Sequence, residues 1–183
     1  MHRGVGPAPA PHITLMRPLA SPDYLRNGRF QRYQMAISPK AFEAAHRRVG
    51  KAWVALAAAL RDPAVVTRLC ARLGLDMPRD WTTHARLQLD RAGARIRPHT
   101  DGENGGLLTF QLYFPLNREN YETGTRFFEK TPKGFVPARN MPFRSNFAYA
   151  FRIGTESWHG ADAPLGRLSE GRLSLVMRLR AGT

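Results

Sequence analysis

The second half of the chain alternates apolar and polar residues with a period of two, which predicts β-strands. Leucine, phenylalanine or methionine occupies every second position of 107–115 and of 172–180. Alternate residues of a strand face opposite sides of a sheet, so each segment has one apolar and one polar face. We expect the apolar faces to pack against helices and the polar faces to line a cavity, because a strand buried on both sides is normally apolar throughout.

The same alternation, interrupted by polar and glycine-containing stretches, predicts further short strands. Strands are expected at about 82–90, 107–115, 125–129, 147–153 and 172–180, with a short one ending at His99 and an edge strand within 30–37. Loops or turns are expected at 102–106, 117–124, 131–142 and 154–160, the last of which holds His159.

Two segments in the first half carry apolar residues at helical spacing. Ser38-Pro39 supplies an N-cap and a proline at the first helical position, and Asp62-Pro63 repeats this signal. Gly74 is expected to end the second helix. The chain is therefore predicted to be α+β, mainly β: an antiparallel barrel or jelly roll with N-terminal helices, about 39–74, packed on one sheet.

Length and composition fit a single folded unit. The 183 residues, 43% of them hydrophobic, are enough for one core. Residues 1–22 are expected to form a flexible arm and 23–183 a single domain. No apolar run is long enough to span a membrane and no secretion signal is found, so no membrane partner is expected. The single cysteine, Cys70, favours a reducing, cytoplasmic location and is expected to be a small buried hydrophobe.

The net charge of +14 comes mostly from arginines that are scattered along the chain. Such a charge attracts nucleic acid, a membrane surface or an anionic substrate. Because the arginines do not gather in one block or on one predicted helix face, we interpret the charge mainly as compositional. Nucleic acid remains the less favoured partner.

The candidate chemistry begins at a His-x-Asp motif. His99 and Asp101 are two residues apart beside a strand, so both can face one point. They supply two corners of a facial Fe(II) site if a third ligand arrives from elsewhere. His159 follows in a later turn. Arg172 and Ser174 share one face of the last strand, where a guanidinium and a hydroxyl can hold one carboxylate together.

This order of motifs resembles the Fe(II)- and 2-oxoglutarate-dependent oxygenase superfamily, over about residues 82–180. The surrounding residues are similar to members with prolyl-hydroxylase-type cores, notably 97–101, 108–113, Gly124-Thr125, Asn146 and 157–160. The resemblance implies a double-stranded β-helix (jelly roll) that uses Fe(II), 2-oxoglutarate and O2, with ascorbate as a reductant. It implies Fe(II) ligation by His99, Asp101 and His159. It further implies 2-oxoglutarate binding by Arg172 and Ser174, assisted by Tyr113 or Gln111.

The resemblance also bears on the reaction and the substrate. Halogenases of this superfamily lack the carboxylate that Asp101 provides, so hydroxylation of an unactivated C–H bond, or a related oxidation, is favoured. A compact core suits a small molecule, such as an amino acid, a carrier-bound amino acid or a natural-product intermediate, and the surplus of arginine favours an anionic one. Candidate substrate contacts are Arg86, Gln88, Tyr121 and Arg126.

Several alternatives stay open. Arg167 heads its own Arg-x-Ser, although the alternating strand after Arg172 favours the latter. Arg172 and Arg178 are six residues apart, a spacing similar to that of nucleic-acid demethylases, so a nucleic-acid or protein oxygenase is the second hypothesis. Ser174 and Val176, however, stand where Asn and Thr are expected. A non-catalytic cupin-like binding module is the third hypothesis, which a cosubstrate arginine disfavours.

Overall fold

The computed structural model describes residues 17–18, 32–36, 55–56, 58–91, 94–102, 105–114, 123–162 and 171–182, the first two segments as backbone alone. The strands are β1 (Arg17–Pro18), β2 (Arg32–Ala36), β3 (Trp81–Asp90), β4 (Arg95–His99), β5 (Gly106–Tyr113), β6 (Thr125–Thr131), β7 (Gly134–Asn140), β8 (Ala148–Arg152), β9 (His159–Asp162) and β10 (Arg172–Ala181). The helix is α4 (Pro63–Arg72).

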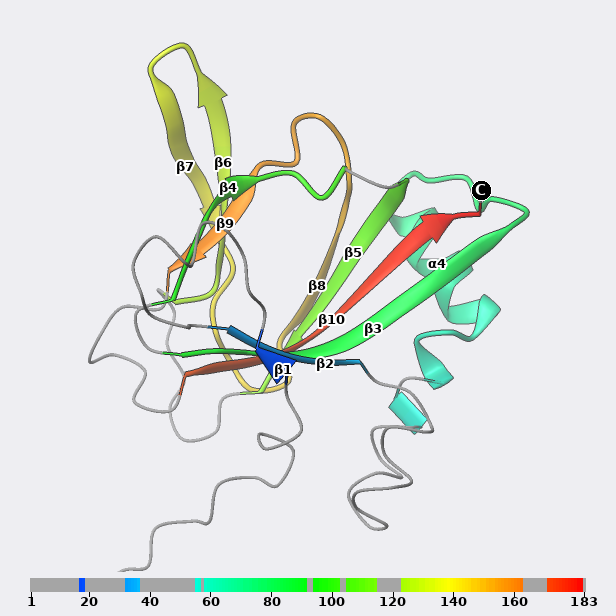
Figure 1. The fold of residues 1–183 in the computed structure, drawn as a ribbon. Coiled ribbons are helices and arrows are strands. Elements are labelled where there is room, and N and C mark those ends of the chain that lie inside the picture. The colour runs from blue at the N-terminus through cyan, green and yellow to red at the C-terminus, as the bar shows by residue number, and fades with distance from the viewer. Residues whose placement is uncertain are drawn as a thin grey trace, which may run out of the picture.

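Two antiparallel sheets make up the described structure (Figure 1). The larger has the strand order β1-β2-β3-β10-β5-β8, and the smaller has the order β4-β9-β6-β7. β10 lies between β3 and β5 and pairs with both along most of its length. The expected mainly β architecture with two antiparallel sheets is therefore confirmed.

The apolar faces of β3, β5 and β10 pack together under α4, as the alternation predicts. Leu87, Leu108 and Leu175 are fully buried there, and Val66 and Cys70 come down from α4. Burying one such aliphatic side chain contributes about 1.5–3 kcal/mol. The polar residues of the same strands are thereby directed to the opposite face of the large sheet.

α4 begins and ends where its sequence signals indicate. The Asp62 side chain accepts a hydrogen bond from the Ala64 backbone N–H at 2.8 Å, and Pro63 is the first helical residue. Gly74 follows the helix with a φ of 64°, a left-handed conformation that costs glycine little. Of the earlier predicted helix, residues 55–56 and 58–59 are helical, and Ser38 and Pro39 lie outside the described residues.

Three local predictions are wrong. The expected loop 131–142 contains β7, which pairs with β6 to form a hairpin. Every residue of β7 is exposed, so no apolar alternation marks it as a strand. His159 is the first residue of β9 and does not lie in a turn. The predicted edge strand, β2, lies between β1 and β3, because the two residues of β1 pair with it.

Two predictions about environment can also be compared with the structure. β1 falls inside the predicted arm 1–22 and pairs with β2, while the division into an arm and one domain stays a prediction. Cys70 is 1% exposed and its Sγ lies 3.8 Å from Met77 Sδ, so its expected role as a buried hydrophobe is confirmed.

None of the helical segments that the structure describes has the length and apolarity needed to cross a bilayer.

We expect Leu175→Ala to lower the free energy of unfolding by about 2–5 kcal/mol, because it removes a fully buried side chain from the central strand and leaves a cavity. Urea denaturation of the two proteins measures the difference. Val136→Ala is the matched control, because Val136 is 51% exposed on β7 and its truncation should change stability by less than about 0.5 kcal/mol. Equal effects of the two substitutions would contradict this assignment of the core.

Candidate metal centre and adjoining cavity

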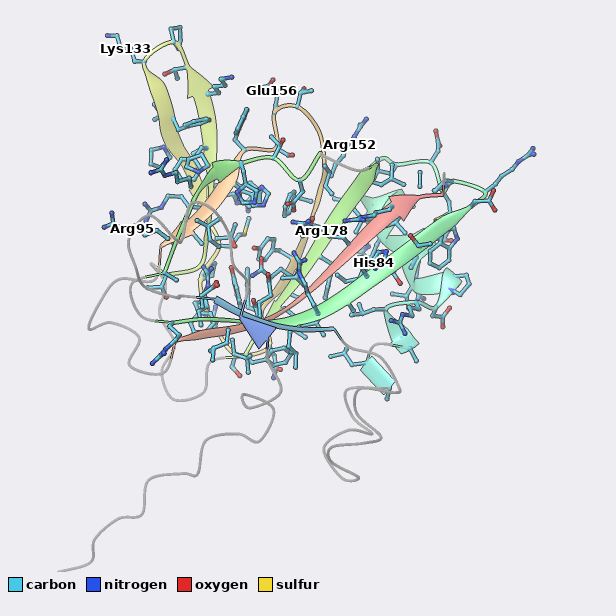
Figure 2. All side chains as sticks on the ribbon, in the orientation of Figure 1. His84, Arg95, Lys133, Arg152, Glu156 and Arg178 are labelled. Atoms are coloured by element: carbon cyan, nitrogen blue, oxygen red, sulfur yellow. The ribbon has the colours of Figure 1, made fainter. Side chains whose placement is uncertain are left out.

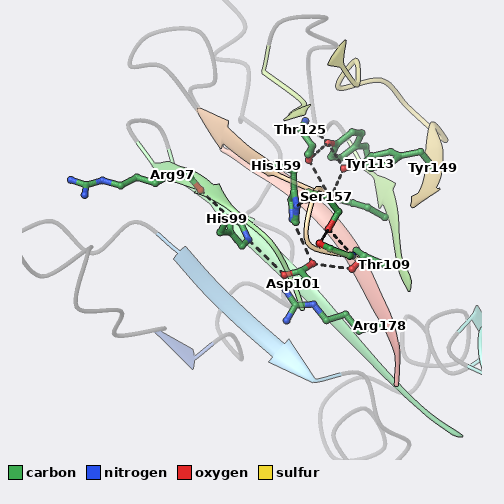
Figure 3. Close-up of polar contacts among 12 residues, drawn as sticks. Arg97, His99, Asp101, Thr109, Tyr113, Thr125, Tyr149, Ser157, His159 and Arg178 are labelled. Carbon is green, nitrogen blue, oxygen red and sulfur yellow. Dashed lines mark hydrogen bonds and ion pairs between the residues drawn. The ribbon is translucent and has the colours of Figure 1, made fainter. Parts of the chain in front are cut away.

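Three candidate metal ligands meet at one end of the smaller sheet (Figure 3). His99 at the end of β4 pairs directly with His159 at the start of β9, and Asp101 follows two residues after His99. His99 Nε2 lies 3.6 Å from Asp101 Oδ1, and His159 Nε2 lies 3.5 Å from Asp101 Oδ2. One ligand atom from each residue lies within 4.8 Å of the other two.

Backbone carbonyl groups orient both imidazole rings. His99 Nδ1 lies 2.9 Å from the carbonyl oxygen of Arg97, and His159 Nδ1 lies 2.9 Å from that of Ser157. A carbonyl oxygen can only accept a hydrogen bond, so Nδ1 is the protonated nitrogen in each neutral ring. The lone pair of each Nε2 therefore points toward Asp101, which is the tautomer that a metal-binding histidine needs.

The Asp101 carboxylate is held from two directions. Thr109 Oγ1 donates to its Oδ2 at 2.9 Å, and Arg178 Nη2 donates to its Oδ1. Burial alone would raise the pKa of this carboxyl. The contacts with His159 and His99 and the charge of Arg178 outweigh burial and hold the pKa of Asp101 well below its usual range. Asp101 is therefore ionised at neutral pH, as a carboxylate ligand must be.

These three residues fit Fe(II) by the chemistry of their donor atoms. Two imidazole nitrogens and one carboxylate form the facial set that non-haem Fe(II) enzymes use. Aromatic rings flank the site: the ring centroids of Phe151 and Phe127 lie 4.8 Å and 6.0 Å from that of His159. Such an apolar wall limits the access of water to a bound metal ion.

A cavity extends from the three ligands over the polar face of the large sheet. Fourteen residues line it, and they include the three candidate ligands: Arg86, Gln88, Ile96, His99, Asp101, Thr109, Gln111, Thr125, His159, Gly160, Ala161, Arg172, Val176 and Arg178. Most of the polar ones come from the cavity-facing positions of β3, β5 and β10, so the alternation that builds the core also builds the cavity.

Arg172 lies at the inner end of this cavity and is 2% exposed. Its Nη2 contacts Asp90 Oδ2 at 2.5 Å, and its Nη1 donates to the carbonyl oxygens of Thr123 and Gly124 at 3.0 and 3.1 Å. Burial by itself would lower the pKa of Arg172. The neighbouring Asp90 carboxylate has the opposite and larger effect, so the pKa is raised and the guanidinium stays charged. Arg172 Nε and Ser174 Oγ are buried and have no hydrogen-bond partner among the described residues.

Several solved structures share this architecture. A Pseudomonas putida prolyl-4-hydroxylase matches 83% of this chain and 73% of its own, at 20% identity and a TM-score of 0.54. The alpha-ketoglutarate-dependent epimerase SnoN of nogalamycin biosynthesis matches 92% of this chain and 66% of its own, at 15% identity and a TM-score of 0.57. A 2OG-Fe(II) oxygenase family oxidoreductase from Burkholderia pseudomallei matches 90% and 72%, at 10% identity and a TM-score of 0.52.

The chain has the fold of the 2OG-Fe(II) oxygenases. No protein-family model matches the sequence, and no curated protein is similar enough in sequence to match. The shared fold confirms the jelly roll that the order of motifs implies. It leaves the reaction and the substrate to be argued from the residues of the site.

Within this oxygenase fold, most of the predicted site residues converge. Arg86, Gln88, Gln111 and Arg172 line the cavity together with the three candidate ligands. Ser174, on the same face of β10 as Arg172, is buried but does not line the cavity.

Two predicted residues, Tyr113 and Arg126, do not line the cavity. Tyr113 is fully buried beside the cavity, where its hydroxyl accepts a hydrogen bond from the Thr125 backbone N–H at 2.7 Å. Arg126 on β6 is not among the cavity-lining residues. Tyr121 and the rival arginine, Arg167, lie outside the described residues, so both remain predictions.

Three residues of the site were not predicted: Asp90, Thr109 and Arg178. Asp90 lies two residues after Gln88, and Thr109 lies two residues before Gln111, so each shares a strand face with a residue that was predicted. Extending the alternation along β3 and β5 would have found both. Arg178 was noted for its spacing from Arg172, but its contact with Asp101 depends on how two sheets meet.

We expect Asp90→Ala to lower the free energy of unfolding by about 3–5 kcal/mol, because it leaves the buried charge of Arg172 without its carboxylate. Urea denaturation measures the effect. Glu129→Ala is the control, because Glu129 is an exposed acid on β6 and its loss should cost less than about 0.5 kcal/mol. A loss below about 1 kcal/mol for Asp90→Ala would mean that another group compensates Arg172.

Proposed function

We propose that this chain is an Fe(II)- and 2-oxoglutarate-dependent dioxygenase that hydroxylates an unactivated C–H bond of a small molecule. The observation that carries the proposal is the set of His99, Asp101 and His159, whose two Nε2 lone pairs converge on a buried, ionised carboxylate. No other arrangement of the described residues gathers three metal-ligating groups. The oxygenase fold supports the proposal.

The requirement for 2-oxoglutarate rests on the inner end of the cavity. Arg172 uses three of its five N–H groups on Asp90 and two carbonyls. Its Nε has no hydrogen-bond partner among the described residues, and neither has the Oγ of Ser174, which lies two residues further on the same strand face. Leaving buried polar atoms unpaired costs about 1–3 kcal/mol each, so such atoms mark a place for a ligand. A carboxylate satisfies both, and the distal carboxylate of 2-oxoglutarate supplies one.

The protein residues then have separate tasks. His99, Asp101 and His159 would hold Fe(II), which would supply oxidation chemistry that depends on 2-oxoglutarate and O2. Arg172 and Ser174 bind the far end of the cosubstrate, and Asp90 orients Arg172. Bound iron supplies the oxidising chemistry, with succinate and CO2 as coproducts and ascorbate as an external reductant. Phe127 and Phe151 limit access of water from one side.

Two observations support hydroxylation of a small molecule. Halogenases of this superfamily lack a carboxylate ligand at the position of Asp101. This chain has the carboxylate, so all three protein ligands are present and hydroxylation is favoured. Residues of both sheets line the cavity. Among the similar structures, one of SnoN contains Fe3+, alpha-ketoglutarate and the small molecule nogalamycin RO.

We expect His99→Ala to abolish the succinate that the wild-type protein forms slowly from 2-oxoglutarate with Fe(II), ascorbate and air. The reason is the loss of one of three metal ligands, which also weakens metal binding. Mass spectrometry of succinate and anaerobic titration with Co(II) provide two independent measurements. His84→Ala is the control, because His84 lies on an exposed part of β3 and is absent from the set of ligands.

The proposed dioxygenase function is refuted if the wild-type protein binds no 2-oxoglutarate at millimolar concentration when the metal is present. Binding without any succinate, even in the presence of candidate substrates, would favour the cupin-like binding module.

We expect Ser174→Ala to weaken 2-oxoglutarate binding by about 2–10-fold while leaving the unfolding midpoint nearly unchanged, because it removes one hydrogen bond to the cosubstrate and no bond within the protein. Calorimetric titration under anaerobic conditions measures the affinity. Ser145→Ala is the control, because Ser145 is exposed and does not line the cavity. If Ser174→Ala changes stability and not affinity, the cosubstrate carboxylate binds elsewhere.

A further inference from the structure

A group of hydroxyl side chains lies against the wall of the cavity and bonds to the side chain of Gln111. Gln111 and Thr125 line the cavity, and the hydroxyl groups of Tyr113 and Tyr149 lie close to that of Thr125 (Figure 3). Two hydroxyl oxygens lie near Gln111 Oε1: that of Tyr149 at 2.6 Å and that of Thr125 at 3.3 Å. The proposed function assigns no task to these four side chains.

The direction of these hydrogen bonds follows from the backbone of Thr125. A backbone N–H can only donate, so the Tyr113 hydroxyl oxygen accepts from Thr125 N at 2.7 Å. The Tyr113 hydroxyl donates its own proton to Thr125 Oγ1 at 2.9 Å. The Thr125 hydroxyl in turn donates to Gln111 Oε1. The chain of donors therefore runs from the backbone to the amide of Gln111.

The contact with Tyr149 identifies which end of the Gln111 amide faces the hydroxyl groups. An O–H···O bond is about 2.5–3.0 Å long, whereas an N–H···O bond is about 2.7–3.2 Å long. The separation of 2.6 Å therefore fits a Tyr149 hydroxyl that donates to the amide carbonyl oxygen. Burial raises the pKa of Tyr149 well above its usual range, so the hydroxyl keeps the proton that this bond needs. With its carbonyl oxygen occupied, Gln111 offers the two N–H donors of its amide to the cavity.

Gln111 lies midway along the cavity-facing positions of β5. Thr109, two residues earlier, donates to Asp101 at the metal end of the cavity. Tyr113, two residues later, lies opposite Ser174 on β10, near the inner end. Residues i and i+2 of a strand are about 7 Å apart. Gln111 therefore lies on the path between the metal ligands and the proposed carboxylate site of Arg172 and Ser174.

The proposed cosubstrate restricts which group the wall can present on this path. At neutral pH 2-oxoglutarate is a dianion, and all of its oxygens accept hydrogen bonds and none donates. The amide N–H groups of Gln111 would stabilise it, whereas the amide carbonyl oxygen would repel it. A glutamine amide can rotate to present either end. Fixing the amide in the favourable orientation before binding reduces the entropy that binding costs.

We propose that Tyr149 is a positioning residue that holds the amide N–H groups of Gln111 toward an oxygen of bound 2-oxoglutarate. This inference rests on the proposed function. Tyr149 lies directly opposite Gln111 across the β5–β8 pair, so the strand register brings the two side chains together. The ring centroids of Phe127 and Phe151 lie 6.2 and 6.3 Å from that of Tyr149. Tyr149→Phe therefore removes the hydroxyl and retains the packing of the ring.

Tyr149→Phe should weaken 2-oxoglutarate binding by about 2–10-fold and leave Co(II) binding unchanged, because one hydrogen bond is lost and no metal ligand is altered. Anaerobic calorimetry of the full-length protein measures both affinities, with Co(II) bound during the 2-oxoglutarate titration. Thr131→Val is the control, because it removes a hydroxyl that bonds to the Gly134 carbonyl in the β6–β7 turn. Figure 2 shows Lys133, in the same turn, at the outer tip of the hairpin, away from Arg178 of the cavity.

Two substitutions of Gln111 separate the orientation of the amide from its packing. Gln111→Leu removes the acceptor of the Tyr149 hydroxyl, so adding Tyr149→Phe should cause no further loss of 2-oxoglutarate affinity. Gln111→Glu retains the shape of the side chain and replaces the amide N–H groups with a negatively charged oxygen. We expect Gln111→Glu to bind 2-oxoglutarate about tenfold or more weakly than Gln111→Leu, because like charges then face each other.

Three results would overturn the inference: wild-type affinity for 2-oxoglutarate in Tyr149→Phe, an equal loss from Tyr149→Phe with and without Gln111, or equal binding by Gln111→Glu and Gln111→Leu. The last comparison needs no substitution of Tyr149, so it still tests the donor role if Tyr149→Phe does not fold. A wild-type protein that binds Co(II) but no 2-oxoglutarate is a different outcome, because it rejects the proposed function itself.

Discussion

The strict alternation of β10 between two faces is the constraint on which the rest of the structure depends. Leu173, Leu175 and Met177 enter the core. On the opposite face of the strand, Arg172, Val176 and Arg178 line the cavity. A slip of one residue would exchange the two sets and place arginines in the core. β10 is held against such a slip by pairing with β3 on one side and β5 on the other. Core packing and site geometry are therefore fixed by one register.

Two arginines that line the cavity, Arg172 and Arg178, each pair with a carboxylate. Asp90 faces Arg172 directly across the β3–β10 pair. Arg172 is only 2% exposed, and its guanidinium remains charged because this carboxylate lies next to it. Arg178 and Thr109 are likewise paired across β10 and β5, and both contact Asp101. The large sheet thus positions the carboxylate, while the small sheet positions the two histidines. A metal ion bound here would join the sheets.

The sequence predicts those features that a short-range pattern encodes. The Asp62 cap, the existence of β5 and the division of β10 into two faces follow from local periodicity and capping chemistry. β7 could not be found in this way, because a hairpin exposed on both faces has no apolar period. The Asp90–Arg172 contact joins residues 82 positions apart, and only the pairing of β3 with β10 reveals it.

Gly124 has a consequence that extends beyond its own turn. A Cβ atom there would lie 1.4 Å from the carbonyl oxygen of Met141, so no side chain fits without moving the backbone. The carbonyl oxygen of Gly124 is also one of the acceptors that hold Arg172. Any randomised library of the cavity should therefore keep position 124 fixed, although it lines no part of the cavity. The Met141 backbone thus determines which residue is tolerated at position 124, and a displacement there would move an acceptor of Arg172.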